Sequence, residues 1–425
     1  MFTSFSTALS ALNATSTAID VVGNNIANLN TTGYKDSSVS FHDLVTQSLG
    51  AGLGETQVGF GTAPPITIRQ FTQGAVQASS GSLDAAVQGD GFFVVQDQST
   101  GATLYTRDGN FQVDAQGNLL TATGQKLQGW TQTNGVLNTN SAIGDIQIPV
   151  GQIRQPTATT NFSLTMNLDA SAQAGSNNGT FSTPIQVVDS LGNPQVLTVT
   201  FTKDPTTPLQ WDYQITIPGD ATTGGTPGTP TPLLATPGTI TFDSSGKMVN
   251  PPATGGAIPV NITGLSDNAA DMNITWNLYD PSGQPLVTQV SNASAVSANA
   301  QDGKTPAQLL RVGMADGGQV MAQYSDGTQQ VVAQLALASI RNPASLIAVG
   351  NNDYQGSAKT ALPAVGTANT GGRGQILGGS LEASTVDIAQ EFTNLIVLQR
   401  AYEANGKIVT TVDQLSQDTI NLKPA

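Results

Sequence analysis

Cysteine is absent from the 425 residues of the chain, and histidine occurs once, at His42. Without cysteine there are no disulfides and none of the thiolate sites that hold zinc or iron–sulfur clusters. A single histidine also excludes the two- and three-histidine metal sites that are common in hydrolases. We therefore expect no metal site and no cofactor.

Charge is also scarce, because only 10% of the residues are charged, and the formal net charge is −14. The fifteen lysines and arginines are scattered singly from Lys35 to Lys423 and form no basic stripe. This pattern argues against nucleic acid and anionic membranes as partners. Apolar runs never reach the eighteen residues that span a bilayer, so we expect no membrane insertion. Residues 1–5 show neither a basic segment nor a continuous apolar one, which argues against a cleaved signal peptide.

Glutamate is much rarer than aspartate: the chain has four glutamates and twenty-five aspartates. Three of the four, Glu382, Glu391 and Glu403, lie near the C-terminus. Glutamate favours helices, whereas aspartate competes with helical hydrogen bonds and favours turns. The 46 glycines and 22 prolines are typical of turn-rich β structure. We therefore expect a helical C-terminus on a β-rich body of two or three domains.

The first thirty residues carry an apolar stripe in which Phe5, Leu12, Ile19 and Ile26 repeat every seven residues. This spacing predicts one amphipathic helix packed against a partner helix. Its other faces are serine, threonine, alanine and asparagine, which support an isolated helix poorly. The residues that we expect to pack are Phe5, Leu9, Leu12, Ile19, Val22, Ile26 and Leu29.

A second seven-residue repeat covers residues 381–422, where no proline interrupts the pattern. It predicts a helix of about forty residues, or about 60 Å. The packing residues expected here are Ile388, Phe392, Leu395, Tyr402, Val409 and Val412. The two stripes lie at opposite ends of the chain and each is too narrow to form a core alone. We expect them to pair, and the pair to bury its remaining apolar face against other copies, which would give a helical polymer.

Between the two helices the apolar pattern has a period of two, as in residues 92–95, 185–188, 196–201 and 213–217. Four segments share the pattern Asp-x-x-Gly, starting at Asp114, Asp189, Asp243 and Asp280. The aspartate opens a turn and the glycine closes it with a positive φ, so these segments predict hairpins. Each offers one carboxylate, too few for a calcium loop.

The predicted fold is mainly β with long terminal α-helices, which pair as a coiled-coil-like unit, followed by two β-rich domains in series. We assign residues 1–30 and 378–425 to the helical unit, and 31–75 and 346–377 to a linker or extended region. The first β-domain comprises 76–145 and 301–345, and a distal outer β-domain comprises 146–300. The Gly-rich stretches 50–61 and 366–379 are predicted to be compliant segments.

Catalytic signatures are weak throughout. His42 could join a serine–histidine–aspartate triad, but no Gly-x-Ser-x-Gly elbow supplies a nucleophile. The glycines of 50–61 match neither Gly-x-Gly-x-x-Gly nor a P-loop. We therefore expect no catalytic residues and no enzyme.

Three ordered motifs resemble the flagellar rod and hook axial proteins. The first lies in residues 8–35, the second in 88–93, and the third in 381–405. The positions that carry the resemblance are Asn24, Asn25, Ile26, Ala27, Asn28, Thr32, Gly33, Gly89, Asp90, Gly91, Phe92, Phe93, Gln399, Arg400, Ala401, Tyr402 and Asn405. One departure is Thr385, where the family usually has asparagine; threonine keeps a hydroxyl that can make a local cap.

Within this family the chain resembles the hook members, because rod members are shorter and lack a segment comparable to 146–300. The stretch 338–352 is also similar to the hook type. The resemblance implies a subunit that is exported unfolded through the flagellar type III apparatus, without signal cleavage, and that self-assembles into a curved tube outside the cell. That tube would transmit motor torque as a universal joint. The implied partners are other copies, the distal rod protein, the hook cap and the hook–filament junction protein.

Two other classes stay open alongside a distal rod or other axial protein. A secreted β-rich adhesin could share the composition, although it would not need seven-residue repeats at both ends. A carbohydrate-active enzyme would need paired carboxylates in a cleft, and the many aspartates leave that open.

Overall fold

The structure is a computed structural model that describes residues 2–44, 47–49, 56–132 and 136–421. The chain forms two compact units. Unit 1 comprises Met1–Val150, Leu310–Gln323 and Thr328–Ala425, and unit 2 comprises Gly151–Leu309 and Tyr324–Gly327. The predicted distal domain, 146–300, covers most of unit 2. The division into two units does not test how the sequence subdivides the rest of the chain, so that subdivision stays a prediction.

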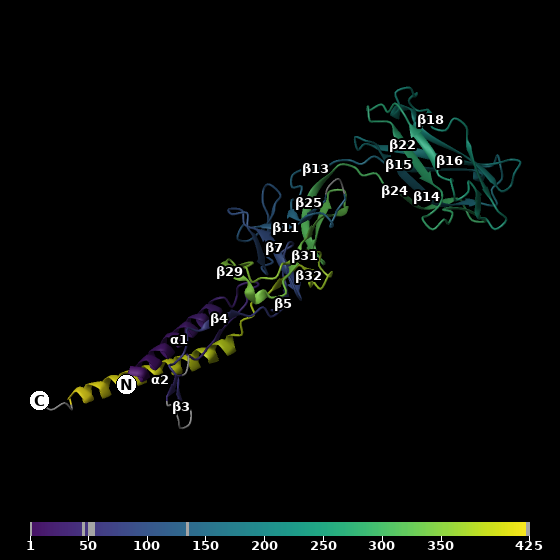
Figure 1. The fold of residues 1–425 in the computed structure, drawn as a ribbon. Coiled ribbons are helices and arrows are strands. Elements are labelled where there is room, and N and C mark those ends of the chain that lie inside the picture. Colours follow the sequence, from purple (N-terminus) through teal and green to yellow (C-terminus); the bar gives the residue numbers. More distant parts are fainter. Residues whose placement is uncertain (1, 45–46, 50–55, 133–135, 422–425) are drawn as a thin grey trace. The chain divides into compact units, whose positions relative to one another are not determined.

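Two long helices, α1 (Phe2–Ala27) and α2 (Ile388–Asn421), pack against each other within unit 1. Figure 1 shows them side by side, with the chain running in opposite directions along the two. At 1.5 Å per residue, α1 is about 39 Å long and α2 about 51 Å. The expected fold class, β-rich with paired terminal helices, is confirmed.

The C-terminal helix begins later than the apolar repeat predicted. Residues 380–382 form strand β33 (Ser380–Glu382), which pairs with β5 (Val76–Ala78). Helix α2 starts only after Asp387, whose side chain accepts hydrogen bonds from the backbone N–H groups of Ala389 (2.9 Å) and Gln390 (3.2 Å). This is an N-cap, and it fixes the helix start at Ile388, seven residues beyond Leu381. The prediction of a helix from 381 was therefore wrong.

The remaining strands of unit 1 form a mixed set of small sheets around one larger antiparallel sheet. That sheet runs through β25, β26, β27, β11, β7, β8, β30 and β29. The bounds are β1 (Ser37–Ser40), β2 (Gln47–Leu49), β3 (Thr56–Val58), β4 (Ile66–Arg69), β6 (Ala85–Gln88), β7 (Phe92–Gln96), β8 (Thr103–Thr106), β9 (Phe111–Val113), β10 (Leu119–Thr121), β11 (Lys126–Thr131), β12 (Gly144–Asp145), β25 (Ala307–Ala315), β26 (Gln319–Tyr324), β27 (Gln329–Leu335), β28 (Leu337–Ser339), η3 (Pro343–Ser345), β29 (Ile347–Gly350), β30 (Asp353–Gln355), β31 (Ala364–Gly366) and β32 (Gln375–Gly378).

Part of the segment that was expected to be a linker belongs to these sheets. Strand β30 pairs with β8, β31 pairs with β28, and β32 pairs with β6. Tyr354, in β30, is completely buried and packs edge-on against Phe92 and Phe71. Aromatic burial of this kind stabilises a fixed position, so these residues are structural parts of the β-domain. Of the other predicted compliant stretch, residues 50–55 lie outside the described part of the chain.

Unit 2 is built from two sheets that share one apolar core. One runs β21-β22-β14-β23 with β24 beside β14, and the other runs β15-β16-β17-β19-β20 with β18 beside β17. The bounds are β13 (Ile153–Arg154), β14 (Asn161–Asp169), η1 (Asn177–Gly179), β15 (Thr180–Val188), β16 (Pro194–Lys203), β17 (Gln210–Pro218), η2 (Gly219–Ala221), β18 (Pro230–Pro232), β19 (Gly238–Phe242), β20 (Met248–Asn250), β21 (Ile258–Ile262), β22 (Met272–Asn277), β23 (Val287–Val290) and β24 (Ala295–Gln301).

Strict alternation of buried and accessible residues along these strands directs one face of each sheet into the core. Trp276 lies at the centre of this core, stacked on Phe162 at 5.9 Å between ring centroids and meeting Phe201 and Tyr213 edge-on. The predicted turns are confirmed. At Asp189, for example, the carboxylate accepts the N–H groups of Leu191 and Asn193, and Gly192 has φ +90°.

Candidate assembly junction

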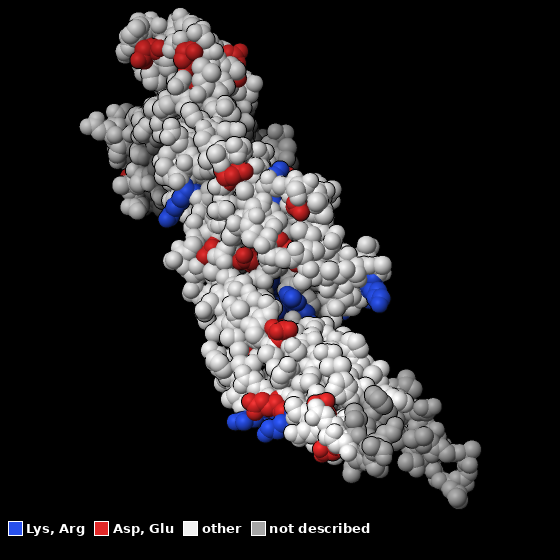
Figure 2. Space-filling view, turned by 90° about the vertical axis from the view of Figure 1, so that its left-hand side faces the viewer, with Lys and Arg blue, Asp and Glu red and all other residues white. Residues whose placement is uncertain are grey.

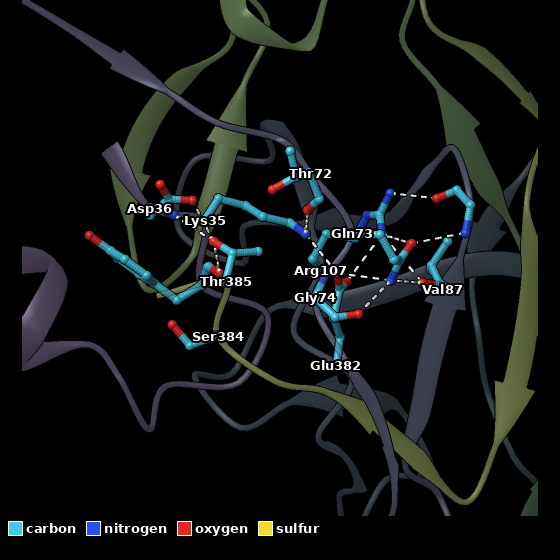
Figure 3. A network of polar contacts seen from close by, with 12 residues as sticks. Lys35, Asp36, Thr72, Gln73, Gly74, Val87, Arg107, Glu382, Ser384 and Thr385 are labelled. Carbon is cyan, nitrogen blue, oxygen red and sulfur yellow. Dashed lines mark hydrogen bonds and ion pairs between the residues drawn. The ribbon is translucent and has the colours of Figure 1, made fainter. Parts of the chain in front are cut away.

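A buried charge cluster in unit 1 is centred on Glu382, at the end of β33. Its side chain is completely buried, and its two oxygens meet Lys35 Nζ at 2.6 Å and Arg107 Nη1 at 3.1 Å. Both cations are nearly inaccessible too, with side-chain exposures of 1% and 6%. Figure 3 shows the three side chains converging from chain segments that are far apart in sequence. The cluster of one carboxylate and two cations therefore has a net positive charge in a buried site.

Neutral groups add further hydrogen bonds to this cluster, while Nε of Arg107 is buried and has no partner. Oε1 of Glu382 also accepts the backbone N–H of Gly74 at 2.7 Å and Nε2 of Gln73 at 2.9 Å. The ammonium of Lys35 donates to the carbonyl of Thr72 at 2.6 Å (Figure 3). Because a buried charge is tolerated only when paired and hydrogen-bonded, removing any one member would leave the others unsatisfied. The cluster therefore fixes residues 35, 72–74, 107 and 382 to one another.

Arg107 extends the cluster into the β-domain. Its Nη2 donates to the carbonyl of Gly89 at 2.8 Å, and its guanidinium lies 5.1 Å from the ring centre of Phe92. Burial lowers the pKa of Lys35, and the Glu382 carboxylate opposes that shift. Residues of the second motif, Gly89 and Phe92, thus contact the same cation that pairs with Glu382 of the third.

Asn25, near the end of α1, is a second buried polar residue that joins distant segments of the chain. Its Nδ2 donates to the carbonyl of Ser37 and to Oε1 of Glu391, both at 2.9 Å. Its Oδ1 accepts the N–H of Ser37 at 3.0 Å and the hydroxyl of Tyr34 at 3.2 Å. The amide is 1% exposed and makes all four bonds within the chain. It therefore locks the end of α1, the segment after it and the start of α2 together.

Two glycines of the motifs lie where neighbouring atoms leave no room for a Cβ. Gly33 has φ +67°, and a Cβ there would lie 2.6 Å from the backbone carbonyl of Arg107. Gly91 has φ +137°, and a Cβ there would lie 2.7 Å from the side chain of Leu337. Any other residue would combine an unfavourable φ with a steric clash. Thr32 is fixed by its carbonyl, which accepts Asn352 Nδ2 at 2.8 Å.

Thr385 uses its hydroxyl for long-range bonds instead of the local cap expected from the sequence. Its Oγ1 donates to Oδ1 of Asp36 at 2.7 Å and accepts the N–H of Asp36 at 2.9 Å. These contacts join the segment after α1 to the segment before α2, next to the Glu382 cluster (Figure 3). The departure from the family pattern therefore retains a polar bridge at this position.

The face of α1 that is buried within the chain consists of small residues. Ala8, Thr15 and Val22 are spaced by seven and are 3%, 6% and 6% exposed, and Ala18 and Asn25 lie beside them. On α2 Glu391 is buried, and the half-buried positions are Asn394, Leu395, Leu398, Ala401, Asn405, Gly406, Val409, Val412 and Ser416, which recur at the helical period. Small side chains let the helix axes approach closely. The repeat length thus matches the one expected from the sequence, but the buried face is shifted around the helix from the apolar stripe.

The predicted packing residues mostly border or lie outside this buried face. Val22 is buried, whereas Phe5, Leu9, Ile388, Phe392 and Tyr402 are exposed by between 41% and 49%. The half-buried positions are Leu12, Ile19, Ile26, Leu29, Leu395, Val409 and Val412. Within one copy, therefore, these five large side chains stay partly exposed. Their contact with other copies stays a prediction.

The C-terminal motif differs from the other two because it lies on the surface of α2. Gln399, Arg400 and Tyr402 are exposed, while Ala401 and Asn405 are half-buried. Arg400 and Glu403 form a salt bridge of 3.2 Å with side-chain exposures of 79% and 62%. An exposed pair of this kind contributes little to stability. Within one copy, the described contacts do not explain the three exposed residues Gln399, Arg400 and Tyr402.

No group of three or more potential metal ligands occurs among the described residues. His42 is exposed and lies 3.4 Å from the hydroxyl of Ser40. Within the described part of the chain, no helix is long and apolar enough to cross a membrane. On the face shown in Figure 2, acidic and basic side chains are scattered over a mostly uncharged surface.

Four family models match the chain in order. They are "Flagella basal body rod protein" at residues 5–35, "Flagellar hook protein FlgE/F/G D1 domain" at 86–224, "Flagellar basal body protein FlaE D2 domain" at 173–304, and "Flagellar basal body rod FlgEFG protein C-terminal" at 377–422. The chain is also 32% identical to the flagellar hook protein FlgE of Borreliella burgdorferi, over the full length of both. The chain belongs to the flagellar hook protein family.

Other hook proteins are similarly related to it. The FlgE protein of Escherichia coli is 30% identical over 99% of this chain and all of its own length, and that of Salmonella typhimurium is 31% identical over the same shares. The crystal structure of Helicobacter pylori FlgE2 matches with a TM-score of 0.53 at 16% identity, covering 72% of this chain and 100% of that one. That likeness shows a shared fold.

As a member of the hook protein family, the chain is a structural subunit of the bacterial flagellar hook, located in the hook and basal body. The two terminal family models match the two helices and their flanking motifs. Sequence reasoning found these motifs but missed the Glu382 cluster. The sequence offered one hint of this cluster, because Glu382 is one of only four glutamates in the chain. It lies before the C-terminal helix, whereas Glu391 and Glu403 lie within that helix.

Proposed function

We propose that this hook subunit polymerises with copies of itself through the outer faces of α1 and α2, and that the resulting tube transmits motor torque as a flexible joint. One observation carries the proposal. Nine large apolar side chains are exposed among the described residues of the two helices: Phe5, Leu9, Ile388, Phe392, Ile396, Val397, Tyr402, Ile408 and Leu415. Clusters of this size on a helix pair mark interaction surfaces.

The C-terminal motif supports the same surface. Arg400 and Tyr402 project from α2 without contacts that would explain their place in the motif. Tyrosine and arginine are enriched where protein surfaces are buried on association. A role in contacts between subunits accounts for Arg400 and Tyr402, whose place in the motif is not explained by contacts within one copy.

The buried cluster around Glu382 supports a division of mechanical roles. Torque applied to a β-domain reaches the helices only through the segments that join them. Lys35 and Glu382 lie in those two joining segments, and they are bonded to each other, to residues 72–74 and, through Glu382, to Arg107 of the β-domain. We infer that this cluster is a stiff connection, and that bending takes place elsewhere.

The remaining partners follow from the same role. We propose contacts with the distal rod protein, the hook cap and the hook–filament junction protein, and export through the flagellar type III apparatus without a cleaved signal peptide. We also propose that the chain has no enzymatic activity. The absence of cysteine and the single exposed His42 support that reading.

A chain that begins after Ala27 tests the polymerisation proposal. Concentrated full-length protein should form tubes in electron micrographs, whereas the truncated chain should remain monomeric, because it lacks Phe5 and Leu9 and the helix against which α2 packs. Unit 2 should fold unchanged in both, which near-ultraviolet circular dichroism of Trp211 and Trp276 would report. Tubes from the truncated chain would contradict the proposal.

The distal β-domain is the second element to test. We propose that it forms the outer contact that sets supercoiling, since it is a compact unit with its own core. Replacing residues 151–309 by a short glycine–serine linker should leave straight tubes. Tubes with the curvature of the full-length protein would contradict this role.

A further inference from the structure

The core of unit 2 contains a lysine at a position where the strand pattern otherwise places apolar residues. The buried positions of β16 alternate with accessible ones, and they are Leu197, Val199, Phe201 and Lys203. Lys203 therefore faces the same side of the sheet as Phe201, which belongs to the apolar core. Its exposed fraction is 5%. Lysine is rarely buried to this extent unless an acidic side chain pairs with it.

The ammonium group of Lys203 lacks such a pair. Among the residues that the structure describes, none accepts a hydrogen bond from this group, which is inaccessible. It lies 5.1 Å from the centre of the Trp211 ring, so a cation–π contact offsets part of its desolvation. Burial lowers the pKa of Lys203, and the Asp169 carboxylate opposes that shift.

Two more polar atoms at this end of the core are buried without a hydrogen-bond partner in the described chain. One is Oε1 of Gln289, whose Nε2 donates to the carbonyl of Pro208 at 3.4 Å. Pro208 lies in the loop between Lys203 and the next strand. The other is the indole nitrogen of Trp211, which pairs with Lys203 across the two strands. Each buried polar group without a bond raises the free energy of the folded state.

Unit 1 treats its fully buried lysine differently. Lys35 is 1% exposed, and its ammonium bonds to the Glu382 carboxylate and to the carbonyl of Thr72. The fold can therefore pair a buried lysine, and it does so where the helices join the β-domain. In unit 2 the unpaired Lys203 weakens a core that no disulfide supports, because the chain has no cysteine.

We propose that Lys203 and Gln289 keep the stability of unit 2 low, so that the chain unfolds easily for export through the flagellar type III apparatus. This inference rests on the proposed export of an unfolded chain and gives two core residues a part in it. Apolar side chains at the same two positions would make unit 2 more stable and therefore slower to unfold.

Urea unfolding of the purified full-length chain tests the effect on stability. Lys203→Met keeps the length of the side chain and removes its charge. The midpoint of unit 2, which contains Trp211 and Trp276, is followed by tryptophan fluorescence and should rise by about 1 M. The control Lys247→Met makes the same change at an exposed lysine of unit 2 and should leave the midpoint unchanged.

An unchanged midpoint for Lys203→Met would overturn the inference. If that variant does not fold, Gln289→Met takes its place, because it removes the unpaired Oε1 from the same end of the core. Its midpoint should also rise, and an unchanged or lower midpoint would again overturn the inference.

Export tests the second step. In the bacterium that makes the chain, each variant replaces the parent, and pulse-labelled subunit is measured outside and inside the cells. The exported share of Lys203→Met should fall about twofold or more, while Lys247→Met should match the parent. A stabilised variant that is exported as well as the parent would overturn the inference and leave the proposed export standing. Export of the parent from cells without a type III apparatus would instead contradict the proposed export, and the inference with it.

Discussion

Asn25 Nδ2 lies 2.9 Å from Oε1 of Glu391, a hydrogen bond between residues 366 positions apart. The bond joins the first and third sequence motifs directly. Because it lies where the two helices meet the rest of unit 1, it sets the register of one helix against the other. The second oxygen of the same carboxylate is buried and accepts no hydrogen bond.

Asn25→Ala should therefore be destabilising. The change removes four hydrogen bonds and leaves Glu391 and the N–H of Ser37 unpaired in a buried site. We expect a loss of about 3 kcal/mol in the free energy of unfolding, measured with urea. Asn28→Ala is the control, because its bonds to Asn24 are exposed, and it should cost under about 0.5 kcal/mol. Equal effects would contradict the role of Asn25.

Glu382→Gln should have a larger effect. The amide keeps the size of the side chain but leaves Lys35 and Arg107 buried without an anion, at a cost of about 3–5 kcal/mol. The matched change Glu403→Gln breaks only the exposed pair with Arg400 and should cost under about 0.5 kcal/mol. Urea unfolding of both variants would show the difference. A Glu382→Gln protein as stable as the parent would refute the stiff-connection account.

Gly33→Ala separates two causes of strain. Gly33 and Gly101 have nearly the same φ, +67° and +69°, but a Cβ at Gly101 meets nothing within 4 Å. Gly101→Ala should therefore show the cost of the φ angle alone, about 1 kcal/mol. Gly33→Ala adds a clash with the Arg107 backbone and should cost clearly more in the same unfolding measurement. Equal costs would show that the backbone adjusts freely around Gly33.

Stability should depend on pH through Asp353. Burial raises the pKa of its carboxyl to about 7, and Asp108 and Asp97 add to the rise. Between about pH 4 and 7 the folded chain binds the proton and the unfolded chain does not, so stability falls as pH rises through that window.

The variant Asp353→Asn removes this titration. A three-unit shift sets an upper limit of about 4 kcal/mol, so the variant should be more stable than the parent at pH 8 by up to that amount. The difference should shrink towards zero at pH 4. Thermal unfolding at both values measures it. A constant difference across pH would rule out Asp353 as the titrating group.

Much of the fold was predictable because its signals are local. The seven-residue repeats, the period-two strands and the four Asp-x-x-Gly turns each reflect spacing along a short segment. The start of α2 was not, since the apolar repeat runs on through Leu381 into β33. Only the pairing of Leu381 with Gln77 and the cap at Asp387 define the boundary, and strand pairing is a tertiary contact.

The candidate site was only partly predictable for the same reason. Lys35 and Glu382 each lie in a motif, but nothing in a local pattern shows that they meet across the fold at 2.6 Å. The stripe of large apolar residues drew attention to Phe5 and Leu9, whereas Ala8 and Ala18 are the residues buried in the helix pair. Sequence hydrophobicity gives weight to large side chains, while close helix packing selects small ones.

The central claim is that the exposed apolar side chains of the helix pair drive assembly. Phe5→Asp with Leu9→Asp places two charges on that surface without changing a buried residue. The control is Leu191→Asp with Val249→Asp, at sites on unit 2 that are 53% and 54% exposed. Electron microscopy of the three proteins at one concentration is the direct measurement. Tubes from the parent and the control, with none from the helix variant, are the predicted result; tubes from the helix variant would contradict the account.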